Sequence, residues 1–186
     1  MRRIKTAAVA CVTVLALTAV SAASASAHEF VASKTGTTKD KQLNTQKFKT
    51  NGGTVECKEE TSEGTVTELK SKTSIEKIKY SGCKAFGFSV TVGEAEDEFN
   101  AEGTVTILKK QVVKAIGCEV TVEPSAKNTN LKTVSFTNNS GKLKVGVAVK
   151  GITYTSTGGL CGKSGENGEY SGEAEEELVG GTLEWI

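Results

Sequence analysis

Apolar and polar residues alternate with a period of two along much of this chain, the spacing of β-strands that bury one face. The pattern is clearest from Phe86 to Val92, from Cys118 to Val122 and from Leu143 to Val149. Weaker alternations occur at Val66–Leu69, Phe99–Ile107, Val134 with Phe136, Ile152 with Tyr154, and Leu183 with Trp185. These segments are rich in threonine and valine, which favour strands. The pattern therefore predicts an all-β protein.

Glycine marks the turns between these runs. Glycine clusters lie at 51–53, 158–159 and 180–181, and the single proline, Pro124, is expected to end the strand before it. Only Ser74 to Lys79 has apolar residues spaced as in a helical turn. About ten short antiparallel strands favour a single β-sandwich, with a β-barrel as the alternative.

The first 27 residues have the three parts of an export signal. A basic start is followed by an apolar stretch from Ala7 to Val20, and Ala25-Ser26-Ala27 fits a cleavage site. That stretch is shorter than the ~20 residues a membrane-spanning helix needs. We therefore predict a signal peptide at 1–27, an N-terminal segment with the first strands at 28–50, and a disulfide-linked β-domain at 51–186. The mature protein is expected to be secreted, with no transmembrane segment.

The charge of the mature chain argues against a nucleic-acid partner. Removing 27 of 186 residues takes three of the 23 basic residues and none of the 22 acidic ones, so the net charge becomes −2. Both arginines leave with the signal, and arginine is the favoured residue for phosphate and base-edge contacts. The remaining lysines are spread among glutamates, as on an ordinary solvated surface.

Four cysteines remain after the signal, and an exported chain would oxidise them. Three pairings into two disulfides are possible. We favour the sequential pairing because it closes the shortest loops. The alternative is a structural zinc site, but such sites use close-spaced ligand pairs and this chain has no Cys-x-x-Cys. The predicted pairs are Cys57–Cys83 and Cys118–Cys161.

No set of residues singles itself out as catalytic. The only histidine, His28, would be a flexible mature N-terminus, so a serine-histidine-acid triad has no positioned base. Acidic clusters at 94–98 and 173–177 are expected to form charged edges or loops, with half of each facing solvent. They could alternatively hold Ca²⁺ or supply the acid pair of a glycosidase. We predict no catalytic residue, metal site or cofactor.

Aromatic residues are few, at 5% of the sequence, and most are expected to face the core, including Phe86, Phe88 and Phe136. Four others could pave a carbohydrate-binding face, although such residues more often pack over a disulfide or the end of a sandwich. These candidate ligand-facing aromatics are Tyr80, Tyr154, Tyr170 and Trp185.

Four segments together resemble a known family. They are 53–57 (Gly-Thr-Val-Glu-Cys), 80–87 (Tyr-Ser-Gly-Cys-Lys-Ala-Phe-Gly), 117–122 (Gly-Cys-Glu-Val-Thr-Val) and 151–162. The chain resembles a group of uncharacterised secreted β-proteins that occur in many paralogous copies in soil actinobacteria. The resemblance implies a small exported β-domain with disulfides and no known activity. A further cysteine pair of that family falls here on Ala95 and Lys109, as if one whole disulfide had been lost.

These observations favour a non-enzymatic extracellular or cell-envelope interaction module that binds a surface polymer or a protein. The alternatives are a secreted hydrolase that uses paired carboxylates, a carbohydrate-binding module, and a carrier of a small ligand. A hydrolase would bring two or three acids with raised pKa together in a concave pocket. A carrier would need a roomy apolar cavity.

Overall fold

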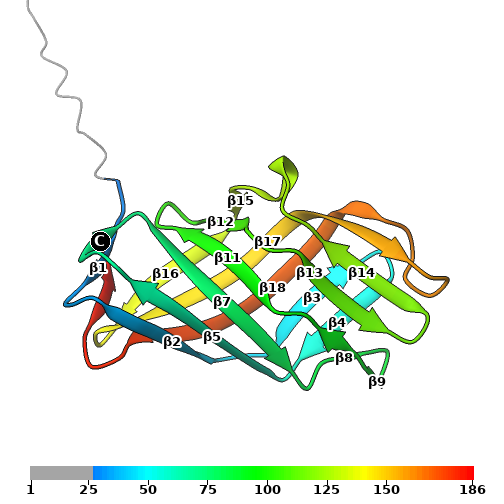
Figure 1. The fold of residues 1–186 in the computed structure, drawn as a ribbon, viewed down its shortest axis with the longest axis horizontal. Helices are drawn as coiled ribbons and strands as arrows, with labels where there is room; N and C mark the ends of the chain where they lie inside the picture. Colours follow the sequence, from blue (N-terminus) through cyan, green and yellow to red (C-terminus); the bar gives the residue numbers. More distant parts are fainter. Residues whose placement is uncertain (1–26) are drawn as a thin grey trace, which may run out of the picture.

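The structure is a computed structural model that describes residues 27–186 (Figure 1). The predicted signal peptide, apart from Ala27, lies outside the described residues. The described chain forms 19 strands and one short 3-10 helix, Ala126–Asn128, and eleven of the strands span five residues or more. The strands are β1 (Phe30–Ala32), β2 (Gly36–Gln42), β3 (Gln46–Thr50), β4 (Gly53–Cys57), β5 (Glu59–Val66), β6 (Lys70–Ser71), β7 (Thr73–Ser81), β8 (Lys84–Ala85), β9 (Phe88–Ser89), β10 (Thr91–Val92), β11 (Ala95–Asn100), β12 (Thr104–Ile107), β13 (Gln111–Ala115), β14 (Cys118–Val122), β15 (Leu131–Lys132), β16 (Val134–Asn139), β17 (Lys142–Thr157), β18 (Gly165–Leu178) and β19 (Leu183–Trp185).

One large antiparallel sheet contains most of these strands. Its main order is β10-β13-β14-β17-β18-β2-β5-β7-β11-β12-β15, with β16 beside β17 and with β3, β4, β8 and β9 branching from β18. The sheet folds over itself, so that β5, β7 and β11 lie in front of β16, β17 and β18 in Figure 1. Within the described residues the two end strands, β10 and β15, do not pair with each other, so the sheet does not close. The all-β sandwich is confirmed, and the barrel alternative is not formed.

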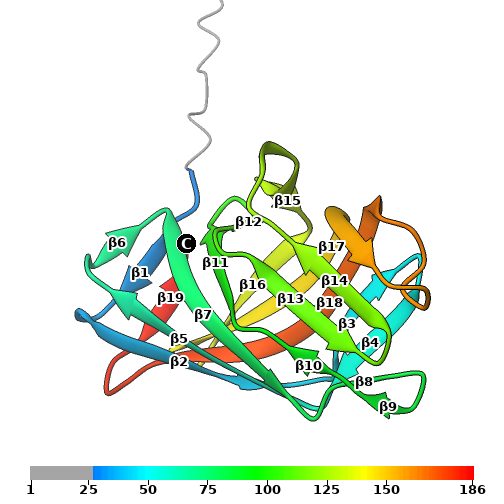
Figure 2. The same ribbon diagram turned by 45° about the vertical axis from the view of Figure 1, so that its right-hand side comes forward.

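A small second sheet, β19-β1-β6, covers one end of the sandwich (Figure 2). Here Phe30 packs edge-to-face on Phe136, with 4.9 Å between the ring centroids, and Trp185 lies against Phe136. The segment 28–50 contributes β1 to this sheet and β2 and β3 to the large one, so its strands pair with those of the segment from 51 onward.

Both disulfides are present with the predicted pairing. Cys57 is bonded to Cys83 and Cys118 to Cys161. The strand that ends before Pro124 is also confirmed, since β14 stops at Val122. The long strand β17 buries Leu143 and Val149 with the alternation that its sequence predicts.

Two predictions from spacing are wrong. Ser74 to Lys79 belongs to strand β7, and the three-residue spacing puts Ile75 outside and Ile78 inside. The run from Phe86 to Val92 contains two short strands, β9 and β10, and Phe86 and Phe88 are 73% and 65% exposed rather than buried. Phe86 has a positive φ of 51° and forms the tip of the β8–β9 hairpin with Gly87. A period of two shows that side chains share a face, but not which medium that face contacts.

Candidate functional site

The two acidic clusters lie on strands inside the sheet rather than at its edges. Residues 95–98 belong to β11, between β7 and β12, and residues 173–177 belong to β18, between β17 and β2. The expectation of a charged edge or loop is therefore wrong. Alternation still sends half of the second cluster outward, where Glu173 and Glu175 pair with lysines of β17. It sends Glu176 inward, to 6% exposure.

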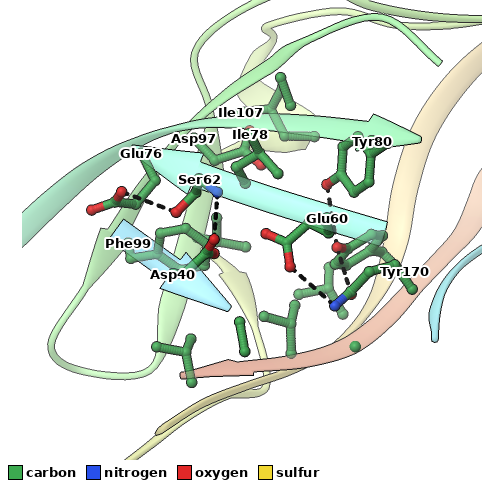
Figure 3. Close-up of a pocket in the computed structure, with 18 of the residues that line it drawn as sticks. Asp40, Glu60, Ser62, Glu76, Ile78, Tyr80, Asp97, Phe99, Ile107 and Tyr170 are labelled. Atoms are coloured by element: carbon green, nitrogen blue, oxygen red, sulfur yellow. Dashed lines mark hydrogen bonds between the residues drawn. The ribbon is translucent and has the colours of Figure 1, made fainter. Parts of the chain in front are cut away.

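Carboxyl groups from five adjacent strands line one cavity inside the sandwich, and Figure 3 labels those of Asp40, Glu60, Glu76 and Asp97. We call this set the interior acid cluster; its members are Asp40 on β2, Glu60 on β5, Glu76 on β7, Asp97 on β11 and Glu176 on β18. Glu60, Glu76 and Glu176 are only 4–6% exposed. The cluster forms because β2, β5, β7, β11 and β18 are neighbours in the sheet and each directs one acid to the same face.

Neutral donors hold these carboxyl groups. Glu76 accepts hydrogen bonds from the hydroxyls of Thr38 (3.3 Å), Ser62 (3.2 Å) and Ser74 (2.8 Å). Glu60 Oε2 accepts one from Gln46 Nε2 at 3.2 Å. The Ser62 backbone N–H donates to Asp40 Oδ1. These donors satisfy lone pairs without neutralising charge.

Space for the cluster comes from missing side chains on the same inward face. A Cβ at Gly64 would lie 2.2 Å from Glu76 Oε1, and a Cβ at Gly172 would lie 1.4 Å from Gln46 Oε1. Both glycines occupy inward positions where alternation would otherwise place a side chain. The strands are thus fitted to a polar interior on this side of the sandwich.

Burial shifts the titration of Glu60, Glu76, Asp97 and Glu176 toward the neutral acids. Desolvation, with the charge of Asp40 adding to it, raises the pKa of Glu60 to about 9. Burial also raises the pKa of Asp97 to about 7. Burial raises the pKa of Glu76. Burial also raises the pKa of Glu176, and the neighbouring Glu76 carboxyl adds to that shift.

The cavity beside the cluster is small. Its volume is about 90 Å³, room for a few water molecules, whereas pockets for organic ligands hold roughly 300–1,000 Å³. Among the described residues, no group of three or more histidine, cysteine, aspartate or glutamate side chains is arranged to hold a metal ion.

The four candidate aromatics do not share an exposed face. Tyr80 and Tyr170 line the cavity; the Tyr80 hydroxyl donates to that of Tyr170 (3.2 Å), which donates to Gln46 Oε1 (2.8 Å). Tyr154 is 2% exposed. Trp185 lies in the small second sheet, at one end of the sandwich, and donates from Nε1 to the Ala101 carbonyl. Inward alternation on β7, β17 and β18 explains the buried tyrosines.

His28 is docked rather than frayed. Its ring stacks on the Trp185 indole with 4.2 Å between centroids. Its backbone N–H donates to Glu102 Oε1 at 3.0 Å. The expectation of a flexible terminus is therefore wrong for this residue, which the second sheet holds at the end of the sandwich.

An apolar hollow of about 430 Å³ lies at the opposite end of the molecule. The β3–β4 turn, the β8–β9 hairpin, the β13–β14 turn and the β17–β18 loop surround it, and these connections gather at the right-hand end of Figures 1 and 2. We call it the end groove. Four large apolar side chains on its rim are 65–79% exposed, and they are Phe86, Phe88, Ile116 and Leu160.

The two disulfides fix the walls of the end groove. Cys57–Cys83 ties β4 to the base of the hairpin that carries Phe86 and Phe88, and the Val90 N–H closes that hairpin on the Cys83 carbonyl at 3.0 Å. Cys118–Cys161 ties the turn of Ile116 to the loop of Leu160. The hollow is thus a preformed feature of the scaffold.

Sequence reasoning missed the end groove. It assigned Phe86 and Phe88 to the core and did not consider Ile116 or Leu160. The sequence does indicate that these two residues are exposed, since Ile116 precedes Gly117 and Leu160 follows Gly158-Gly159. Large apolar residues inside glycine-marked turns have no core to enter, so their position alone indicates exposure.

The described residues contain no helix long and apolar enough to cross a lipid bilayer. Comparison of the chain with protein-family models, with curated proteins and with solved structures finds no match.

Proposed function

We propose that this protein is a secreted, non-enzymatic interaction module that binds a partner protein through the end groove. The observation that carries the proposal is the convergence of four large, exposed apolar side chains around an apolar hollow of about 430 Å³. Exposed apolar patches of this kind are typical of interaction sites on soluble domains. The export signal and the two disulfides support an extracellular setting.

A protein surface fits the end groove better than a carbohydrate does. The side chains that line it are apolar except for Thr50 and Thr54, so a sugar would find few hydrogen-bond partners there. The exposed side chains on the rim also favour a protein partner. A small ligand in the hollow would leave the outer faces of Ile116 and Leu160 in water, whereas a surface lying across the end would cover them.

The interior acid cluster supplies one requirement of a hydrolase and lacks another. Its acids converge, and the pKa values of Glu60 and Glu176 are raised, as a catalytic carboxyl pair requires. The adjoining space of about 90 Å³ is too small for a sugar ring or a peptide, and Glu60 and Glu176 are each 6% exposed. A substrate has no room beside these groups, so we assign them a role in the scaffold.

The test is site-specific photo-crosslinking on intact cells of the source organism. A photoreactive amino acid replaces Phe88 in one variant and Leu160 in another. Matched controls carry it at Leu69 and Val179, which are 53% and 48% exposed and lie away from the end groove. We expect one and the same protein adduct from positions 88 and 160, and none from the controls.

A second measurement uses the captured partner once it has been purified. Phe86→Ser and Leu160→Ser should each weaken binding about tenfold or more, as expected for apolar anchors at the centre of an interface. Equal adducts from both ends of the molecule would overturn the proposal. So would the absence of a protein adduct together with stoichiometric binding of a fatty acid, which would identify a small-ligand carrier instead.

A further inference from the structure

The interior acid cluster faces only neutral or acidic groups. From β2 it meets Thr38, from β5 Ser62, and from β7 Ser74 and Tyr80. The remaining elements packed against it contribute Gln46 and Phe48 from β3, Phe99 from β11, Gln111 from β13, and Tyr170 and Glu173 from β18, together with apolar side chains of β12 and of β14 to β17. Within residues 27–186, no lysine, arginine or histidine lines this cavity. The negative charge of the interior acid cluster can therefore be lowered only if its carboxyl groups keep their protons.

The carboxyl groups are arranged to retain protons in pairs. Glu60 lies beside Asp40 and Glu176 beside Glu76, close enough for each neighbouring carboxyl group to raise the pKa of Glu60 or Glu176 in addition to burial. Two carboxyl groups can share a hydrogen bond only when one of them is protonated, because two carboxylates have acceptors alone. The second oxygen of Glu176, Oε1, is buried without a partner among the described residues, a position that a carboxylate charge would make costly.

We propose that the interior acid cluster is a proton-retaining core that makes the stability of this fold depend on pH, greatest in acid and declining as the pH rises through and above neutrality. The inference is independent of the end groove and of the proposed partner. It assigns a structural purpose to acids that a catalytic role would not explain.

The direction follows from proton linkage. The folded chain keeps its protons over a range in which the unfolded chain has lost them: for Glu60 from the ordinary pKa of 4.5 to about 9, and for Asp97 from 3.8 to about 7. Wherever the folded state binds more protons, raising the pH favours unfolding. The stabilisation is fully present below the ordinary pKa values and is lost as the pH rises through the raised ones.

The experiment is thermal unfolding of the disulfide-linked protein at pH 5, 7 and 9 with ionic strength held constant. We expect the wild-type Tm to fall by about 5–10 °C over this range. Glu60→Gln and Glu176→Gln imitate the protonated acids, so each should raise the Tm at pH 9 and flatten the dependence. The matched control is Glu63→Gln, on the exposed face of β5, which should leave the curve unchanged.

Infrared spectroscopy of the wild-type protein gives a second measurement that does not depend on a variant folding. At pH 7 the spectrum should contain the carbonyl band of protonated carboxylic acids, and Glu60→Gln should reduce it. A spectrum without that band, or a Tm that rises from pH 5 to pH 9, would contradict the proposal. A wild-type Tm at pH 9 that increases on adding Ca²⁺, with no increase in Glu176→Gln, would also overturn it, because the cluster would then be a cation site.

Discussion

The interior acid cluster is built by regular strands that direct carboxyl groups inward, whereas the end groove is built by turns that direct phenylalanine, isoleucine and leucine side chains outward. Each region reverses the usual distribution of residues, in which large apolar side chains are buried and acids are exposed. The two reversals are stabilised differently. The cluster depends on hydrogen bonds and retained protons, and the end groove depends on covalent bonds.

The two regions differ in how their departure from the usual pattern affects the stability of the fold. A buried carboxyl group is tolerated only if it stays neutral or keeps its donors, so the cluster limits the conditions under which the fold is stable. An exposed large apolar side chain forgoes roughly 1.5–3 kcal/mol of burial but leaves the rest of the fold unaffected. The first region therefore constrains stability, and the second is free to serve recognition.

Within the end groove, the largest expected effect comes from removing its covalent support. Replacing Cys118 and Cys161 together by alanine opens a link between residues 43 apart, which should lower the free energy of unfolding by about 4 kcal/mol. The corresponding change at Cys57 and Cys83, 26 apart, should cost about 3.5 kcal/mol. Urea unfolding of both double variants measures this. Losses below about 1 kcal/mol would show that the strands hold the walls without the bridges.

A smaller effect is expected from breaking the hydrogen bonds of the interior acid cluster. Gln46 is 3% exposed and joins Tyr170 to Glu60 by accepting from one and donating to the other. Gln46→Leu keeps the approximate volume but leaves both partners unsatisfied, so we expect a loss of about 2–3 kcal/mol at pH 7. Urea unfolding measures it, with Gln111→Leu as the control that removes one hydrogen bond to a carbonyl. An equal loss in both variants would mean that Gln46 contributes nothing beyond an ordinary bond.

The sequence predicts the apolar half of the fold well. Leu143 to Val149 and Cys118 to Val122 lie in strands because one face of each is packed against the core, so the alternation is visible. The disulfide pairing was also predictable. Sequential pairing closes the shortest loops, and an exported chain is expected to have oxidised cysteines. These features depend on burial of apolar groups or on chain connectivity, both of which a single sequence records.

The polar half could not be predicted in the same way. Strand β18 lies in the middle of the sheet, yet its inward positions include Gly172, Ala174 and Glu176, which give no apolar period. Strand β5 likewise turns Glu60 and Ser62 inward. Their burial follows from pairing with neighbouring strands. An acidic strand and an acidic loop look alike in sequence, so the cluster became visible only through the register of the sheet.

The smallest expected effect on stability is at the rim of the end groove, and it tests the contrast between the two regions most directly. Phe88 is 65% exposed and Phe136 is 7% exposed, although each lies in an apolar alternation that predicts burial. Phe136→Ala should cost about 3–5 kcal/mol because it empties a packed site in the core. Phe88→Ala should change the free energy of unfolding by less than about 0.5 kcal/mol. Urea unfolding of the two variants side by side measures the difference; similar losses would mean that Phe88 is part of the core and not of a recognition surface. A near-zero value for Phe88 would agree with a side chain that is placed for contact with a partner rather than for packing within the fold.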